Sequence, residues 1–362
     1  MKINNLFIPG ILFLVLAIAS CKKDGDKISG PPIISKVTTS LNHGNGITAG
    51  ALNQWVVIHG KNLSGTQKVV FDDLEVNYED IYASDTLVSV QIPRRIPAET
   101  LNKLTVTTPL GSATYEFQVV YPALKFSRLK NEYQQEGSIL DIEGDNFDLY
   151  FEKENMKVTF AGGVEATITE LNATTIKVIV PAGAEKGPLL IKGGEPLNSE
   201  INTVSSWYKD DRNMMIVEPV LVPGPLTESS PDFPDNPAPM LIKAGDYAAG
   251  GWDTFFSTYI NFPAGAVTNV DGYAMKFEMN TKIPISIGDI IFRLGNNNYY
   301  RWPYNYFGTV INTNNQWETI SIPLKLIAVD PTDNVYFQFI LSDGNSRTLN
   351  FATCNFRIVP IN

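Results

Sequence analysis

The amino-acid sequence predicts an all-β protein built from antiparallel sandwiches. Of its 362 residues, 27 are glycine and 23 are proline. Only 18% are charged, against about 25% in an average globular protein. Short runs that alternate apolar and polar residues recur along the chain, with turn residues between them, which is the pattern of half-buried strands. The length accommodates two or three domains of this kind, and the pattern argues against coiled coils and helical solenoids.

Charge and histidine content exclude several classes of function. The chain has 28 basic and 38 acidic residues, a formal net charge of −10, whereas a protein that binds the nucleic-acid backbone normally presents a basic surface. The two histidines, His43 and His59, leave little material for histidine-based metal centres or Ser-His-Asp catalysis. Glycine-rich phosphate loops and Gly-x-Ser-x-Gly elbows are absent from the sequence. We therefore expect no nucleic-acid partner, no metal and no cofactor.

Residues 1–20 have the features of a secretory signal peptide. Lys2 gives a basic start, Leu6–Ala19 is almost wholly apolar, and small residues precede Cys21. The apolar run is shorter than the roughly 20 residues that span a bilayer. This segment resembles the lipobox of bacterial lipoproteins, which implies that Cys21 is acylated and becomes the mature N-terminus. An ordinary secreted protein with an incidental cysteine is the alternative.

The anchor is expected to continue into a short linker. Residues 21–30 are charged and contain glycine, as in a flexible tether, and they resemble the surface-export tag of Bacteroidota lipoproteins. The other cysteine, Cys354, has no partner if Cys21 is acylated, so we expect a buried free thiol in the final strand.

The next two segments, 31–121 and 122–208, repeat one order of motifs. In each, the first strand ends in Gly-x-Asn-(Leu/Phe), and the third is followed by proline. The three strands are expected at residues 54–63, 68–71 and 86–93, and again at residues 138–147, 157–160 and 175–181. Their matched order predicts two related antiparallel sandwiches.

These repeats resemble the IPT/TIG family of immunoglobulin-like domains. The resemblance implies tight turns at Gly60 and Gly144, which we expect to need a positive φ. Alternation in the first repeat directs Val56 and Ile58 toward the core and leaves Trp55 and the solvated His59 on the opposite face. We expect such modules to act as spacers or interaction surfaces.

Residues 209–362 are predicted to form a larger C-terminal β-sandwich of the jelly-roll type. Seven prolines between residues 219 and 239 require a loop, which we expect to lie over the domain that follows. Strands are expected at 258–262, 273–279, 289–294, 318–324, 335–341 and 351–358. Trp317 begins one of these strands and is expected to be structural.

The aromatic residues gather in this last domain, which holds 22 of the 39 in the chain. Between Gly295 and Gly308 six of fourteen residues are aromatic and are interleaved with asparagine and arginine. We read this stretch as turn-rich, and such a segment cannot bury all six rings because its backbone polar groups also need partners. Exposed rings stack on the C–H faces of sugars, and amides and guanidinium groups bond to hydroxyls, so the composition favours a glycan-binding site. Trp252, which follows two glycines, is a second candidate; an aromatic-packed structural loop is the alternative in both places.

The order of the parts resembles the surface glycan-binding protein B type of lipoprotein, from polysaccharide-utilisation systems of Bacteroidota. The residues that carry the resemblance are Trp207–Asn213, Phe277-Glu278-Met279, Tyr300-Arg301-Trp302-Pro303, Trp317–Leu324 and Asn355–Val359. The resemblance implies an outer-membrane, cell-surface protein without catalytic activity, which binds a polysaccharide or oligosaccharide and works beside a TonB-dependent transporter and its partner lipoprotein. The implied glycan contacts are Trp252, Asn298, Tyr300, Arg301, Trp302, Tyr304 and Tyr306. The chain departs from the family in having only two IPT-like modules and in the order of residues 301–303, so the resemblance does not transfer the identity of the glycan.

Two alternatives belong to other classes of protein. A glycoside hydrolase needs two carboxylates roughly 5–10 Å apart, and no pair stands out in the sequence. An adhesin that binds a protein partner would use the same immunoglobulin-like spacers.

Overall fold

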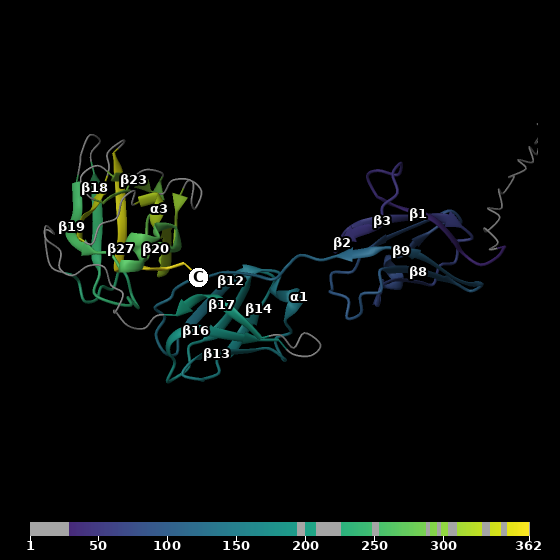
Figure 1. The fold of residues 1–362 in the computed structure, drawn as a ribbon, viewed down its shortest axis with the longest axis horizontal. Helices are drawn as coiled ribbons and strands as arrows, with labels where there is room; N and C mark the ends of the chain where they lie inside the picture. The colour runs from purple at the N-terminus through teal and green to yellow at the C-terminus, as the bar shows by residue number, and fades with distance from the viewer. Residues whose placement is uncertain are drawn as a thin grey trace, which may run out of the picture. The chain divides into compact units, whose positions relative to one another are not determined.

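A computed structural model describes most of the chain from Ser29 onward. The described residues are 29–193, 200–207, 226–247, 253–286, 290–294, 298–302, 310–327, 334–341 and 346–361. The predicted leader and most of the predicted linker lie outside them. The chain divides into two compact units, Met1–Tyr121 and Pro122–Asn362. Nearly all regular structure is strand, which confirms the predicted all-β class (Figure 1). Among the described residues, no helix is both long and apolar enough to cross a bilayer.

The first unit is a two-sheet sandwich. One sheet has the order β1-β3-β7-β6, the other β5-β4-β8-β9, and β2 pairs in parallel with β10. The bounds are β1 Ile33–Thr39, β2 Ala49–Ala51, β3 Trp55–Lys61, β4 Lys68–Phe71, β5 Leu74–Glu75, η1 Tyr78–Asp80, β6 Tyr82–Ala83, β7 Leu87–Gln91, β8 Lys103–Thr108, β9 Gly111–Glu116 and β10 Gln118–Val120. Val56 and Ile58 are buried in its core, as predicted. On the opposite face of β3, Trp55 is 37% exposed and its ring lies 6.1 Å from that of Tyr82.

The first module of the second unit repeats this plan. Its sheets have the orders β11-β12-β15-β14 and β13-β16-β17, and β11 carries a bulge against β12 as β1 does against β3. The bounds are β11 Lys125–Leu129, β12 Ile139–Asp145, α1 Phe147–Tyr150, β13 Lys157–Ala161, β14 Thr167–Leu171, β15 Thr175–Ile179, β16 Glu185–Lys192 and β17 Glu200–Trp207. The three recurring strands are thus present in both modules, and the predicted duplication of the sandwich is confirmed.

The repeated glycine has a different role from the one predicted. Neither Gly60 nor Gly144 has a positive φ; Asn62 and Asn146, two residues later, take that conformation at 58° and 65°. At each glycine the neighbouring strand passes so close that a Cβ would lie 1.8 Å from the carbonyl oxygen of Ile33, or 2.1 Å from that of Lys125. The glycine is required by this close approach, and the asparagine, which tolerates the left-handed region, makes the turn.

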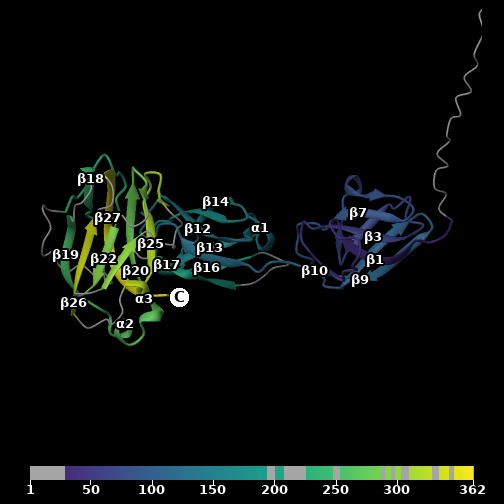
Figure 2. The same ribbon diagram turned by 90° about the horizontal axis from the view of Figure 1, so that it is seen from above.

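The C-terminal domain is a sandwich of two antiparallel four-stranded sheets, β18-β27-β20-β25 and β19-β26-β22-β23 (Figure 2). The bounds are β18 Leu241–Tyr247, β19 Asp253–Asn261, α2 Ala264–Thr268, η2 Val270–Gly272, β20 Tyr273–Thr281, β21 Ile285–Ser286, β22 Ile290–Leu294, β23 Asn298–Trp302, β24 Val310–Ile311, β25 Glu318–Pro323, α3 Leu324–Ile327, β26 Asn334–Leu341 and β27 Arg347–Pro360. All six strands expected here are present. Phe277, Phe292, Phe339 and Phe351, from both sheets, share one hydrophobic core.

Residues 226–240, which contain several prolines, cover the outer face of the sheet β18-β27-β20-β25, as predicted. Phe233 and Met240 pack against Trp317, Ala352 and Cys354 in a small separate cluster. Trp317 is only 7% exposed, and its indole Nε1 donates a hydrogen bond to the carbonyl oxygen of Pro234 at 2.9 Å. The structural role predicted for Trp317 is confirmed, and the ring ties the covering segment to the sheet.

The thiol of Cys354 should be unreactive while the protein is folded. The residue is buried and free, as expected, and burial together with the nearby Glu278 raises the pKa of the thiol well above its ordinary value. In a Cys21→Ser protein we expect no reaction with a thiol-specific disulfide reagent until guanidinium unfolds the chain. A second variant, Ser112→Cys, places a thiol at an exposed position and should react at once. Rapid native labelling of Cys354 would contradict its buried placement.

Candidate functional site

The first candidate site is the edge of the second sheet, where β23 pairs with β22. Tyr300 lies opposite Phe292 and Trp302 opposite Ile290, so both rings face the domain core. Arg301 lies between them on the other face and is exposed. Residues 295–308 were expected to be turn-rich, and this was wrong for residues 298–302, which form a regular strand. Its alternation separates two core-facing rings from an exposed guanidinium.

Trp302 does not present its ring to solvent. It is 0% exposed, and its ring centroid lies 5.8 Å from those of both Phe277 and Phe292. The predicted role of Trp302 as an exposed sugar platform was therefore wrong, because a fully buried ring has no surface on which a sugar can stack. Tyr300 is half-buried against the same core.

The other four predicted glycan contacts have side chains outside the described part of the structure. Asn298 belongs to β23, but its side chain is outside the described part of the structure. Trp252, Tyr304 and Tyr306 lie outside the described residues altogether. Of the seven predicted contacts, the structure thus places Arg301 at the surface and Trp302 in the core.

A buried charge network joins the second module to the outer face of the first C-terminal sheet. Arg357 on β27 donates two hydrogen bonds of 2.8 Å to the carboxylate of Glu278 on β20. It donates a third, of 2.9 Å, to Glu132 of the second module, whose other carboxylate oxygen pairs with Lys276. The Tyr133 ring lies 5.1 Å from the guanidinium carbon. Burial opposes the charge of Arg357, but Glu278 and Glu132 raise its pKa above its ordinary value, so the guanidinium stays protonated.

A β-bulge directs Arg357 into this network. The register between β20 and β27 shifts between Lys276 and Glu278, and Asn355 on β27 has a positive φ of 56°. The extra residue changes the alternation, so that Phe356 enters the core and Arg357 turns to the outer face. Asn355–Val359 and Phe277-Glu278-Met279, recognised in the sequence only as family motifs, thus carry the two sides of one ion pair.

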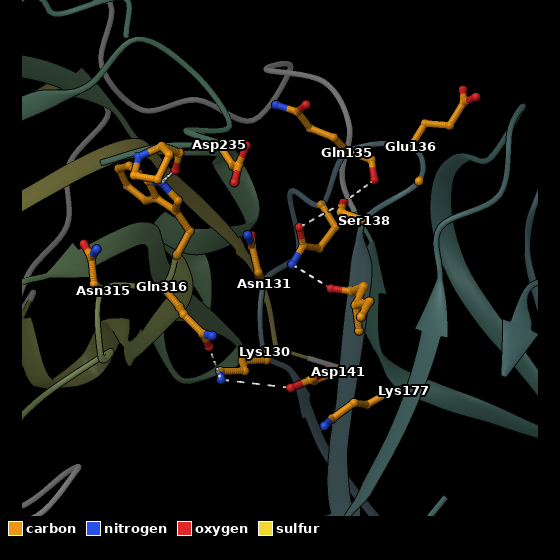
Figure 3. A pocket seen from close by; sticks show the side chains of 15 residues that line it. Lys130, Asn131, Gln135, Glu136, Ser138, Asp141, Lys177, Asp235, Asn315 and Gln316 are labelled. Carbon is orange, nitrogen blue, oxygen red and sulfur yellow. Dashed lines mark hydrogen bonds and ion pairs between the residues drawn. The ribbon is translucent and has the colours of Figure 1, made fainter. Parts of the chain in front are cut away.

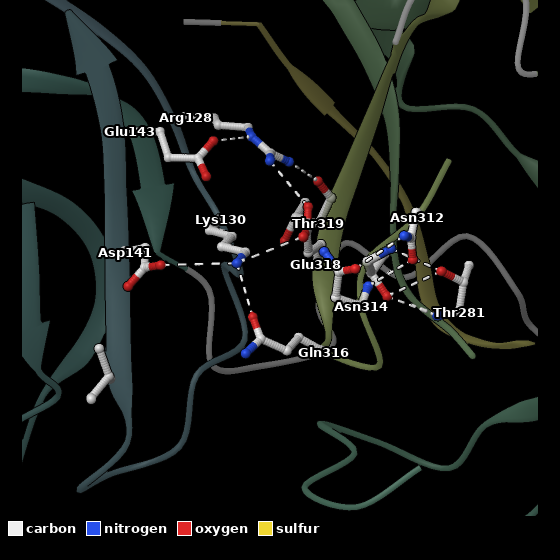
Figure 4. Close-up of polar contacts among 12 residues, drawn as sticks. Arg128, Lys130, Asp141, Glu143, Thr281, Asn312, Asn314, Gln316, Glu318 and Thr319 are labelled. Carbon is white, nitrogen blue, oxygen red and sulfur yellow. Dashed lines mark hydrogen bonds and ion pairs between the residues drawn. The ribbon is translucent and has the colours of Figure 1, made fainter. Parts of the chain in front are cut away.

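A second set of polar contacts runs beside the network (Figure 4). Arg128 on β11 bonds to Glu143 on β12 at 2.7 Å and to Glu318 on β25 at 3.1 Å. Lys130 donates to the side-chain oxygen of Gln316 at 2.9 Å. The contacts to Glu318 and Gln316 could not be predicted from the sequence, since these partners are almost two hundred positions away in the chain and no local pattern links them.

A cleft of about 610 Å³ opens next to these contacts, between the second module and the C-terminal domain (Figure 3). It is lined by Lys130, Asn131, Gln134, Gln135, Glu136, Gly137, Ser138, Ile139, Asp141, Lys177, Pro234, Asp235, Asn315, Gln316 and Trp317. Five of these side chains are amides. Sequence reasoning missed the cleft because its lining comes from three short polar segments and one residue of β15.

The fold and these sites define a class of protein: an all-β chain in which an immunoglobulin-like module is held against a C-terminal β-sandwich by a buried ion network. Residues 125–208 match the family model of the IPT/TIG domain, and residues 197–360 match the model described as the surface glycan-binding protein B xyloglucan binding domain. The resemblance inferred from the sequence is thereby confirmed for the second module and the C-terminal domain.

Two known proteins illustrate the similarity. An IPT/TIG domain-containing protein of Bacteroides ovatus is 29% identical over 160 residues, which are 40% of this chain and 31% of that protein. The match therefore spans about a third of the relative's length. The crystal structure of the surface glycan-binding protein PbSGBP-B from Prevotella bryantii has a TM-score of 0.56 at 18% identity, over 92% of this chain and 100% of that one. This second likeness concerns the fold.

Proposed function

We propose that this protein is a non-catalytic, cell-surface glycan-binding lipoprotein whose C-terminal domain binds a polysaccharide. The observation that carries the proposal is the match of residues 197–360 to a xyloglucan binding domain, which makes xyloglucan the first polysaccharide to test. In this proposal Cys21 is lipidated, the protein lies on the outer membrane, and the bound glycan passes to a TonB-dependent transporter and its partner lipoprotein.

The placement of the buried carboxylates supports binding without catalysis. Glu132 and Glu278 are both held by Arg357, and Thr319 donates a further hydrogen bond of 2.9 Å to Glu278. A carboxylate that is enclosed and paired in this way has a structural role and is poorly placed to exchange protons with a glycosidic oxygen.

Within the C-terminal domain, we propose that the glycan contacts lie along and beyond β23. Arg301 supports this because its guanidinium is exposed at the edge of the sandwich, where it can donate to sugar hydroxyls. Trp252, Asn298, Tyr304 and Tyr306 remain candidate contacts, and half-buried Tyr300 can offer only part of its side chain. Trp302 would act from the core, by holding the strand in place.

Calorimetry or affinity electrophoresis against a polysaccharide panel tests the proposal. We expect xyloglucan or a related glycan to bind without any release of reducing ends. Arg301→Ala and Tyr304→Ala should each weaken binding about tenfold, the scale of a good interface contact. Arg95→Ala, which removes an exposed arginine from the first unit, is the matched control and should have no effect. Turnover of any glycan would indicate a hydrolase, and binding of a protein partner with no glycan would indicate an adhesin; either would overturn the proposal.

A further inference from the structure

We propose that the cleft between the second module and the C-terminal domain is a second glycan subsite, lined by both domains. The inference rests on the proposed function, because it assumes that the ligand is a polysaccharide. It goes beyond that function because the IPT/TIG module would also contact the glycan. This second surface lies away from β23 and consists of described residues.

The cleft is held open by contacts that do not depend on a ligand. Residues 130–132 are fixed between two strands: the amide of Lys130 donates to the carbonyl of Asp141 at 2.9 Å, and the amide of Thr319 donates to the carbonyl of Lys130 at 2.7 Å. The amide of Glu132 also donates to the hydroxyl of Thr319 at 2.8 Å. A site that is already ordered loses little conformational entropy when a ligand binds.

Asn131, at the centre of this fixed segment, supplies an unused donor. It is only 3% exposed, and its Oδ1 accepts the backbone amide of Tyr133 at 2.9 Å. Its Nδ2 makes no hydrogen bond within the described residues, and it is not among the fully enclosed polar atoms that lack a partner, so it keeps some access to solvent. Figure 3 shows Asn131 between Gln316 on one side and Ser138 on the other. The amide is thus placed to donate to a group that enters the cleft.

The chemistry of the lining indicates an uncharged, polyhydroxylated ligand. The two lysines of the lining, Lys130 and Lys177, lie among three acidic residues, Glu136, Asp141 and Asp235, so the lining carries a net charge of only −1. No group of three or more potential metal ligands occurs in the described part of the chain. Amides offer donors and acceptors together, as sugar hydroxyls require, while Ile139 and Trp317 add apolar atoms to the lining. The volume lies within the roughly 300–1,000 Å³ of ordinary ligand sites.

The cleft is distinct from the surface beside β23. It lies at the N-terminal end of β25, next to Gln316 and Trp317, whereas α3 follows the other end of that strand and contacts β22 and β23. Six residues of strand separate the two ends by about 20 Å. A polysaccharide is long enough to bind in the cleft and beside β23 at once. An oligosaccharide shorter than about 20 Å that is bound beside β23 cannot also reach the cleft.

The contributions of the two sites can be distinguished by measuring the affinity of the full chain for two ligands: xyloglucan polymer and a short xylogluco-oligosaccharide. Asn131→Asp keeps the Oδ1 bond to Tyr133 and removes the free donor; Gln135→Ala removes an exposed amide that has no side-chain bond. We expect the two changes together to weaken binding of the polymer at least tenfold and to leave binding of the oligosaccharide beside β23 within twofold. In ¹⁵N-labelled protein, the polymer should also shift the side-chain amide signals of Asn131 and Gln135.

Matched controls are available outside the cleft. Asn42→Asp makes the same change in an exposed residue of the first unit whose Oδ1 also accepts a turn amide, and Gln67→Ala removes another exposed amide. Neither should alter binding. If the polymer binds with unchanged affinity to the cleft variants and their amide signals do not move, the subsite is overturned while the proposed function stands. If the unmodified protein binds no polysaccharide, both are overturned.

Discussion

Arg357→Ala is expected to lower the free energy of unfolding of the second unit by about 3–5 kcal/mol, the usual cost of removing one partner from a buried ion pair. The substitution leaves Glu132 and Glu278, which are 2% and 0% exposed, without their shared guanidinium. Urea unfolding followed by tryptophan fluorescence measures the loss. A Trp55→Phe background removes the one tryptophan of the first unit, so that the signal comes from the second unit alone.

Two further variants separate the sources of this effect. Lys157→Ala breaks an ion pair with Glu165 in which both side chains are more than half exposed, and it should cost no more than about 1 kcal/mol. Arg357→Lys keeps the charge but loses the two-bond geometry toward Glu278, so an intermediate loss is expected. A loss for Arg357→Ala no larger than that of the exposed control would contradict the buried network.

The network should also couple the two domains of the second unit. Glu132 belongs to the IPT/TIG module, whereas Glu278 and Arg357 belong to the C-terminal sandwich. Arg128 and Lys130 add contacts to Glu318 of β25. Because opening the interface would leave buried charges unpaired, the two domains are expected to unfold together in a single transition. In Arg357→Ala the transition should broaden or split.

The sequence predicts the sandwiches well because strands are recognised from patterns of neighbouring residues. Alternation along β12 is regular, and the same motif order occurs twice, so strands and modules can be found without knowing their partners. The function of Gly60 and Gly144 could not be found in the same way. A sequence shows that a glycine is present, but the carbonyl that crowds it comes from another strand.

The ion network illustrates a second limit. Strict alternation from Phe351 would place Arg357 on the same face as that ring, in the core, and only the bulge at Asn355 reverses this. A bulge adds one residue to one strand and leaves little trace in the pattern. Glu132 is more than two hundred positions away and lies in another domain, so no spacing could have indicated the pair.

Residues 298–302 show both what the sequence can predict and what it cannot. Composition marked residues 298–302 as part of a mixed aromatic and polar stretch, but the neighbouring glycines and Pro303 concealed a strand. Once the strand exists, pairing with β22 decides which rings are enclosed, and that pairing cannot be read from composition.

Trp302→Ala is expected to destabilise the second unit by about 3–5 kcal/mol, as truncation of a fully buried aromatic side chain usually does. The ring fills the space between Phe277 and Phe292, and the cavity left behind would lie within the sandwich core. Arg301→Ala, one residue earlier and exposed, should change stability by no more than about 0.5 kcal/mol. Urea unfolding in the Trp55→Phe background measures both variants. If Trp302→Ala instead kept its stability and lost only its affinity for the glycan, the ring would have to be exposed in solution, as composition alone suggests, and its placement in the core would be wrong.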